Sequence, residues 1–280
     1  MKPSHPLMLA TVLLACSALL VGAPVGAQPA GPPGGVAPDW TLTVGVAPVV
    51  SPVFQGSDQY GLSVFPDLRV NYRDVFFASV PDGIGYNLVN TARWKLGPLA
   101  KLRFGRQEDT GGSPFLITGT TDGLRGLGEV DLATELGGFA QYDGGAWRLR
   151  AELRRGYGGH TGVVGDLSLS LLGRVGRVSY SVGPRLAWGT DAFLQPYFGI
   201  DARQAAASGL ALHQARGGLV SFGLGAAAVR PLGTRAAVTL FAGLDRLGGP
   251  LRDSPLIRQR GAPLQFSAGL GYGYRFGWSR

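Results

Sequence analysis

Leu264-Gln265-Phe266-Ser267-Ala268-Gly269-Leu270-Gly271-Tyr272-Gly273-Tyr274-Arg275-Phe276 is the stretch that decides the fold class of this chain. Apolar residues occupy every even position in it, and glycine or polar residues occupy every odd position. Because successive side chains of a β-strand point to opposite faces, the stretch predicts a strand with one apolar face. Its aromatic residues Tyr272, Tyr274 and Phe276 also resemble the C-terminal insertion signal of outer-membrane barrels, although four residues follow them.

The same alternation recurs along the chain, in 40–48, 147–153, 180–188, 220–228 and 236–244. A soluble β-sandwich also alternates. Here, however, the polar faces are rich in Gly, Ser, Thr and Arg, as in a filled lumen, and aromatic residues gather near the strand ends. The pattern therefore predicts an all-β protein, a closed antiparallel transmembrane β-barrel in the outer membrane of a Gram-negative cell.

Connections of contrasting length set the expected number of strands. Short turns are expected at 73–74, 97–98, 144–145, 175–176 and 231–233, and longer loops at 51–59, 87–91, 109–129, 158–162, 190–215 and 248–263. Long and short connections alternate, which predicts twelve strands with both termini on the periplasmic side and the long loops outside. Ten strands are the alternative, if the strands near 75–107 merge around Pro81.

One of these loops, 190–215, is expected to fold back onto the barrel. Its Tyr197-Phe198-Gly199-Ile200 run is too apolar to be solvated, and residues 201–207 are expected to hold a short helical turn.

The N-terminus predicts export. Lys2 precedes a fifteen-residue apolar run, 7–21, which is short for a spanning helix but suits a secretory signal peptide. Small residues place the cleavage between Ala27 and Gln28, so residues 1–27 are the expected signal peptide, 28–38 a short Pro/Gly-rich segment and 39–280 the barrel. A lipoprotein site at Cys16 is the alternative. Cleavage after Ala27 would leave a mature chain without cysteine and therefore without disulfides.

Composition agrees with a β-rich membrane protein. The chain has 46 Gly and 19 Pro in 280 residues, which disfavours long helices, and a hydrophobic fraction of 45%, which excludes intrinsic disorder. The net charge is +8, but the positive residues are spread singly rather than clustered, so we expect no nucleic-acid partner.

The alternation also predicts which charged residues face the lumen. The basic ones are Arg69, Arg93, Lys95, Lys101, Arg103, Arg148, Arg150, Arg154, Arg185 and Arg275, and the acidic ones are Asp67, Asp131, Glu135, Glu152, Asp166 and Asp245. The lumen is therefore expected to be net basic. Two interpretations stay open: a conduction path that favours anions, and a structural network of ion pairs that fills the barrel.

Hairpin signals predict two of these ion pairs. A type I′ turn at Gly144-Gly145 would place Glu135 opposite Arg154. The same construction at 175–176 would place Asp166 opposite Arg185, although a β-branched valine fits such a turn poorly.

Catalytic and cofactor motifs are weak. Ser208 and His213 are close in sequence, and His160 lies in a glycine-rich loop, but no orienting third group can be named for a catalytic pair. The fingerprint-like run 223–228 lies in an expected strand and not at a strand-to-helix turn. We therefore expect no catalytic residue, no cofactor and no metal site.

With these segments placed, the sequence resembles the MipA/OmpV family, the MltA-interacting protein family of outer-membrane β-barrels. The resemblance rests on short stretches in matching order across nearly all of the mature chain: 54–58 with Pro66, 104–106, 126–129, 135–139, 158–162, 197–200, 208–210, 253–256 and 274–276.

This resemblance implies a non-enzymatic scaffold that brings a murein hydrolase, a lytic transglycosylase, together with a murein synthase. Outer-membrane lipids and lipopolysaccharide are the other expected partners. A narrow channel with a basic lumen is the alternative function, and a membrane-embedded lipid enzyme is a remote one, because fold alone does not decide function.

Overall fold

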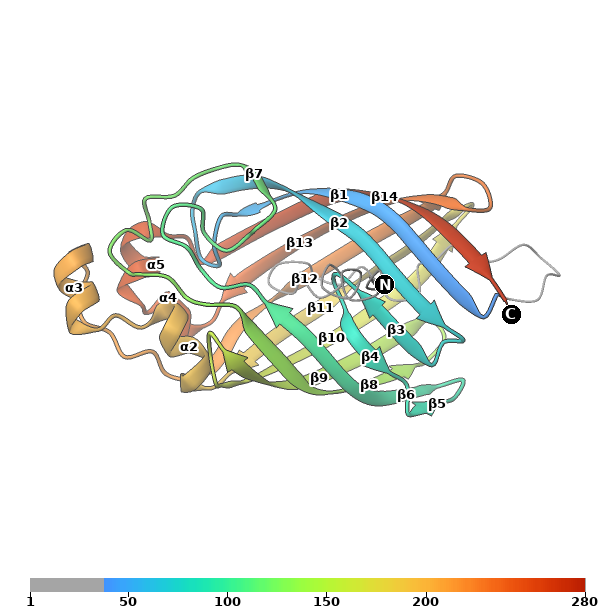
Figure 1. The fold of residues 1–280 in the computed structure, drawn as a ribbon, viewed down its shortest axis with the longest axis horizontal. Coiled ribbons are helices and arrows are strands. Elements are labelled where there is room, and N and C mark those ends of the chain that lie inside the picture. Colours follow the sequence, from blue (N-terminus) through green and yellow to red (C-terminus); the bar gives the residue numbers. More distant parts are fainter. Residues whose placement is uncertain (1–37, 280) are drawn as a thin grey trace, which may run out of the picture.

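Twelve β-strands close into an antiparallel barrel in the computed structural model, which describes residues 38–279 (Figure 1). The ring closes through β1, which pairs with β14 on one side and with β2 on the other. The predicted fold class and strand number are thereby confirmed. The strands of the wall are β1 (Trp40–Pro52), β2 (Tyr60–Tyr72), β3 (Phe76–Ser79), β4 (Gly83–Tyr86), β6 (Trp94–Arg103), β8 (Ala133–Asp143), β9 (Trp147–Gly158), β10 (Val163–Val175), β11 (Val178–Gly189), β12 (Gly218–Pro231), β13 (Ala236–Leu247) and β14 (Leu264–Trp278).

The longer connections gather at one end of the barrel, which we call the outer end, and the short turns gather at the opposite end. We call the opposite end the periplasmic end, because short turns are typical of the periplasmic side of such barrels. The outer end carries α2 (Asp191–Phe198), α3 (Ala202–Ser208), α4 (Gly249–Arg252) and α5 (Pro255–Arg260), on the left in Figure 1. The predicted folding back of the 190–215 loop and its short helix are confirmed, because Phe198 is buried and α3 occupies 202–208.

No helix within residues 38–279 is long and apolar enough to cross a membrane.

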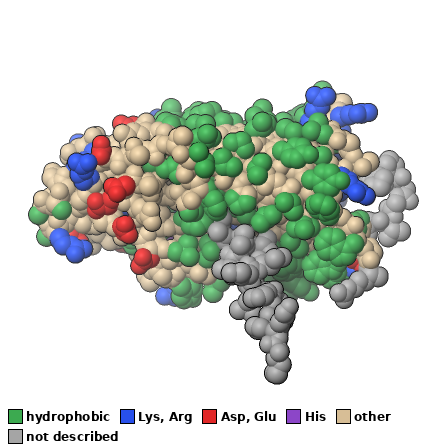
Figure 2. All heavy atoms as spheres, turned by 45° about the horizontal axis from the view of Figure 1, so that its top comes forward, with side chains coloured by type: hydrophobic (Ala, Val, Ile, Leu, Met, Phe, Trp, Pro, Cys, Tyr) green, Lys and Arg blue, Asp and Glu red, His purple; other side chains and the backbone are tan. Residues whose placement is uncertain are grey.

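The wall strands turn their apolar faces outward. On β14, Leu264, Leu270 and Phe276 are half exposed, whereas the intervening Gln265 is buried in the lumen. Figure 2 shows hydrophobic side chains covering much of the middle of the barrel surface that it presents. Of the predicted insertion-signal residues, Tyr272 also faces outward in this belt, and the Tyr274 ring lies 5.0 Å from that of Phe276.

Two strands of the wall are much shorter than their neighbours. β3 and β4 have four residues each and turn back at 80–82, partway along the barrel. Beyond this hairpin, the edge of β2 is covered by β7 (Leu116–Thr118), which comes from the 104–132 connection. At this edge of β2 the Val64 amide and the Leu68 carbonyl both form hydrogen bonds. Pro66 lies between these two residues, and because it has no N–H it leaves no backbone donor unpaired.

The predicted connections at 97–98 and 87–91 were wrong. Gly97 and Pro98 lie within β6, and the 87–93 segment, which contains β5 (Val89–Asn90), lies at the periplasmic end. A Cβ at Gly97 would lie 1.7 Å from the carbonyl oxygen of Tyr86, so this glycine allows a close strand approach rather than a turn. The count of twelve still holds because the hairpin at 80–82 takes the place of the expected loop at 87–91, and the 87–93 segment takes the place of the expected turn at 97–98.

The predicted registers were wrong by two residues. Positive φ angles fall on Gly145 and Gly176, so the two-residue loops are 145–146 and 176–177, one residue later than expected. Consequently Glu135 pairs with Gly156 rather than with Arg154. Similarly, Asp166 lies opposite Ala187, and Arg185 lies opposite Ser168. A shift of two preserves the face of every side chain, so Glu135, Arg154, Asp166 and Arg185 face inward as predicted. The predicted inward placement of Arg93 and Asp131 was wrong, because both are exposed in connections outside the strands.

Candidate functional site

The outer end of the lumen is closed by an apolar core made from the connecting segments, which we call the cap. Helix α2 supplies three of its buried side chains, and α4 and α5 supply others. The buried residues of the cap are Phe54, Leu124, Leu127, Val164, Phe193, Leu194, Phe198, Ile200, Leu210, Ala215, Val220, Leu247, Leu251, Leu256 and Ile257. Burial on this scale gives the cap the character of a folded core rather than of mobile loops.

Phe193 on α2 joins the cap to the lumen. Its ring lies 5.0 Å from the ring of His160 and 4.8 Å from the guanidinium carbon of Arg103. Gly162 allows this approach, because a Cβ there would lie 2.1 Å from the Phe193 nitrogen. Helix α2 therefore packs against the glycine-rich stretch 158–162.

Glu135 on β8 lies at the centre of a buried ionic network next to the 158–162 stretch. It is fully buried and accepts hydrogen bonds from Arg103 (2.5 Å) and Arg154 (2.8 Å), while the His160 Nε2 lies 3.1 Å from its Oε1. This geometry satisfies both carboxylate oxygens in a site from which water is excluded.

The network extends across β6, β9 and β10. Glu152 forms ion pairs with Lys101 and Arg150, each at 2.8 Å, and with Arg154. Arg154 reaches Asp166 as well, at 2.6 Å. Arg154 thus bridges three carboxylates that come from three adjacent strands.

Three further ion pairs lie in the lumen, and Gln141 links one of them to the network, because it accepts from Arg150 at 3.2 Å and donates to Asp143 at 2.8 Å. Arg69 bonds Asp67 at 2.7 Å, Arg148 bonds Asp143 at 2.5 Å, and Arg185 bonds Asp245. The predicted pairing of Asp166 with Arg185 is therefore replaced by two others, with Arg154 and Asp245, because the register differs. Among the other predicted basic residues, Arg275 lies half-buried on the lumen side of β14, opposite Thr43 of β1.

The middle of the lumen is balanced in charge, and further basic residues on the lumen side, Arg174 and Arg275, lie toward the strand ends. Its seven cations are Arg69, Lys101, Arg103, Arg148, Arg150, Arg154 and Arg185, and its seven carboxylates are Asp67, Asp82, Asp143, Glu135, Glu152, Asp166 and Asp245. A balanced interior gives little electrostatic preference for anions. The positive surplus lies elsewhere on the molecule.

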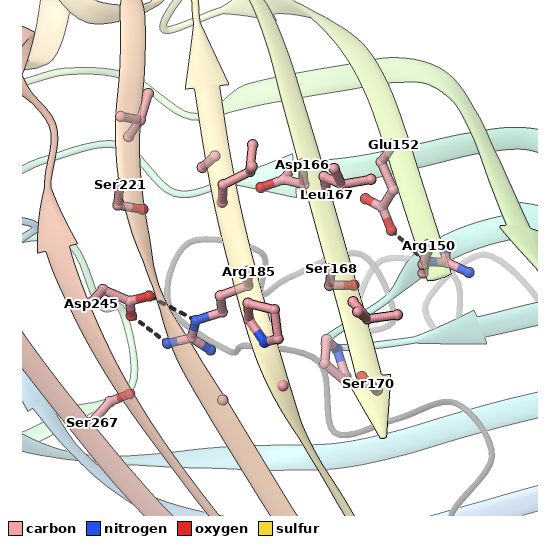
Figure 3. Close-up of a pocket in the computed structure, with 18 of the residues that line it drawn as sticks. Arg150, Glu152, Asp166, Leu167, Ser168, Ser170, Arg185, Ser221, Asp245 and Ser267 are labelled. Carbon is pink, nitrogen blue, oxygen red and sulfur yellow. Dashed lines mark hydrogen bonds and ion pairs between the residues drawn. The ribbon is translucent and has the colours of Figure 1, made fainter. Parts of the chain in front are cut away.

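A cavity of about 310 Å³ lies between the charged wall and an opposite wall of small side chains (Figure 3). The charged wall comes from β6, β8, β9 and β10, and the opposite wall includes Ser181, Ser221 and Ser267. Figure 3 shows the Arg185 guanidinium joined to Asp245 by two contacts on that side. The small side chains leave room for this cavity, while the ion pairs neutralise the cations around it.

Within residues 38–279, Ser208 forms no hydrogen bond with His213 or His160, the histidines considered for a catalytic pair. The Ser208 hydroxyl accepts a hydrogen bond from the Leu210 amide at 3.2 Å, in a local turn. His213 forms a backbone bridge with Ile200, and burial lowers the pKa of its imidazole below the usual value. His160 is engaged with Glu135, and no hydroxyl is bonded to it within residues 38–279.

Arg106 is a structural residue that we did not single out from the sequence. It is buried, and its guanidinium donates to the Tyr197 carbonyl and, at 3.5 Å, to the Leu127 carbonyl. Burial lowers the pKa of Arg106 to about 10. In the sequence, Arg106 is marked only by the Phe104-Gly105-Arg106 stretch, because its partner Tyr197 lies on α2, about ninety residues further along the chain.

Arg260 on α5 holds the cap from the opposite side. Its guanidinium donates to the carbonyls of Gly123 (3.3 Å), Arg125 (3.2 Å) and Ser208. Together, Arg106 and Arg260 link three connecting segments, 104–132, 190–217 and 248–263, through backbone carbonyls, which keeps the cap closed.

Comparison with known proteins gives one family and several similar solved structures. The profile of a family described as MltA-interacting protein MipA matches residues 44–276. A comparison with curated proteins finds no match. Among solved structures, an outer membrane channel from Pseudomonas putida F1 is similar with 13% identity and a TM-score of 0.39, over 90% of this chain and 98% of that one. A bacterial polysaccharide outer membrane secretin is similar with 9% identity and a TM-score of 0.41, over 86% and 100%. The CymD monoaromatic hydrocarbon channel is similar with 10% identity and a TM-score of 0.36, over 88% and 90%.

Proposed function

Because this chain belongs to the MipA family and is an outer-membrane β-barrel of a Gram-negative cell, we propose that it is a non-enzymatic, non-conducting scaffold for murein enzymes. In this role the barrel anchors the protein, and its periplasmic side holds a murein hydrolase and a murein synthase close together. The description of the family, MltA-interacting protein, supports a murein enzyme as one partner.

The observation that carries the proposal is the closed outer end. A channel needs a continuous water path, whereas the cap fills the outer mouth with a packed apolar core. Beneath it, Glu135, Arg103 and Arg154 form a bonded network that spans the lumen side of β6, β8 and β9. A barrel closed and cross-linked in this way suits a rigid anchor better than a pore.

The test is a pull-down from detergent-solubilised envelopes with the tagged full-length protein, followed by identification of the bound murein enzymes. We expect both a hydrolase and a synthase to be recovered in the same complex. An unrelated twelve-stranded barrel with the same tag serves as the control. Recovery of neither enzyme above this control would overturn the proposed scaffold.

A further inference from the structure

The positive surplus of the described chain lies at its periplasmic end. Residues 38–279 hold all Lys and Arg residues of the chain except Lys2 and Arg280, and all of its Asp and Glu residues. The lumen interior is balanced, and the outer end carries as many basic as acidic residues, Arg106, Arg125, Arg155, Arg203, Arg216, Arg246, Arg252, Arg258 and Arg260 against Asp58, Glu108, Asp109, Asp122, Glu129, Asp131, Asp191, Asp201 and Asp253. The surplus is therefore left to the turns and strand ends opposite the cap, which we call the rim.

The rim combines eight basic residues with two carboxylates. The basic residues are Arg73, Arg93, Lys95, Arg174, Arg177, Arg230, Arg235 and Arg275. The carboxylates are Asp39, bonded to Arg73 at 2.8 Å, and Asp74, bonded to Lys95 at 2.5 Å. Figure 2 shows Lys and Arg side chains at this end, on the right, and both signs of charge at the outer end.

Five rim arginines are exposed and form no ion pair within residues 38–279: Arg93, Arg174, Arg177, Arg230 and Arg235. In the middle of the lumen, by contrast, each of the six arginines named above has a carboxylate partner. Exposed arginines without local partners are available to bind an external anion.

Their positions indicate that most of them face the periplasm rather than lipid. Only Arg230 lies on the outward face of its strand, where it pairs with Val238 of β13. Arg174 lies on the lumen side of β10, and Arg93, Arg177 and Arg235 lie in turns. Lipid headgroups can therefore account for only a small part of the rim.

Four of the five connections at the rim, the hairpin turns at 73–75, 144–146, 176–177 and 232–235, are short, and the fifth is the 87–93 segment. Arginines spread over several short turns can bind a flexible polyanion at several points at once. Arginine matches carboxylates in particular, because its planar fork bonds both oxygens. We propose that the rim binds murein directly, through the free carboxylates of its peptide stems.

This inference goes beyond the scaffold for murein enzymes. It concerns the polymer itself and requires no enzyme. A failed enzyme pull-down with intact murein binding would overturn the scaffold alone, and the converse result would overturn the rim proposal alone.

The test is co-sedimentation of the detergent-solubilised full-length protein with purified murein sacculi. We compare the wild type with a rim variant, R93Q/R174Q/R177Q/R235Q. The matched control is a cap-surface variant, R203Q/R216Q/R252Q/R258Q, which removes the same charge from exposed positions at the outer end. A shift in electrophoretic mobility between boiled and unboiled samples shows that each variant is folded.

We expect the wild type and the cap-surface variant to sediment with sacculi and the rim variant to bind at least about tenfold more weakly. Binding of the wild type should weaken as salt rises from about 50 to 200 mM, because screening shortens the range of exposed charges. Sacculi whose carboxylates have been converted to amides should bind no variant.

Two results would overturn the proposal. One is equal binding to native and amidated sacculi, and the other is an equal loss in the rim and cap-surface variants. If the rim variant keeps its affinity for sacculi but loses affinity for anionic phospholipid vesicles, the rim is a lipid contact and murein is excluded as its ligand.

Discussion

Replacing Glu135 with glutamine tests whether the lumen network holds the cap and barrel together. The substitution keeps the shape of the side chain but removes the charge that Arg103 and Arg154 face at 2.5 and 2.8 Å. Arg154 keeps Glu152 and Asp166 as partners, whereas Arg103 loses its one ion pair among the described residues. The variant therefore leaves one arginine with a buried and uncompensated charge.

Breaking one partner of a buried pair costs about 3–5 kcal/mol. Because Arg154 retains two carboxylates, we expect the lower part of this range, about 3 kcal/mol, which corresponds to a roughly hundredfold change in the folding equilibrium. The assay is urea-induced unfolding in phospholipid vesicles, followed by tryptophan fluorescence, with the slope of the transition compared between variants.

The matched control is Asp122→Asn, which breaks the exposed pair with Arg125 at the outer surface. Exposed pairs contribute little, so this control should leave the free energy of unfolding nearly unchanged. If Glu135→Gln costs no more than the control, the network does not stabilise the barrel and our account of the lumen is refuted.

Three other substitutions test the packing of the same regions. Gly156→Ala would place a Cβ 2.2 Å from the His160 ring and should cost about 1–3 kcal/mol of unfolding free energy, whereas a Cβ at Gly165 would lie no closer than 3.7 Å to any neighbour, so Gly165→Ala should cost less; equal costs would contradict the packing described here. Leu240→Arg on the outward face of β13 should cost about 2–4 kcal/mol in vesicles relative to Leu240→Ala, and a negligible difference would show that this face does not meet lipid. Arg106→Met removes the donors to two cap carbonyls and should speed trypsin cleavage within 190–217, so an unchanged cleavage rate would remove this residue from the cap.

The face of each strand residue could be predicted from the sequence because lipid and lumen impose opposite requirements at alternate positions. That rule placed Glu135, Arg154, Asp166 and Arg185 inside, and it survives a register error of two residues. The carboxylate partner of each arginine could not be predicted in the same way. Arg154 reaches residues on three strands, and this choice depends on side-chain reach across the sheet rather than on which residue lies directly opposite.

Neither the short hairpin at 80–82 nor the contacts of Arg106 in the cap could be predicted from the sequence pattern, for a different reason. β3 and β4 end partway along the barrel because β7, more than thirty residues later, takes their place beside β2. Likewise, the buried role of Arg106 depends on α2, which lies about ninety residues further along the chain. Contacts at such separations leave no local periodicity. The motif stretches 104–106 and 158–162 nevertheless mark the two segments that contact α2.

Single-channel recording in planar bilayers is the most direct test of a closed barrel. With the purified and folded wild-type protein, the closed cap and the bonded lumen predict no current steps above the baseline of protein-free lipid, at any applied voltage that the bilayer survives. Stable, ohmic steps from the wild type would contradict the account, because they would require a continuous water path through the cap.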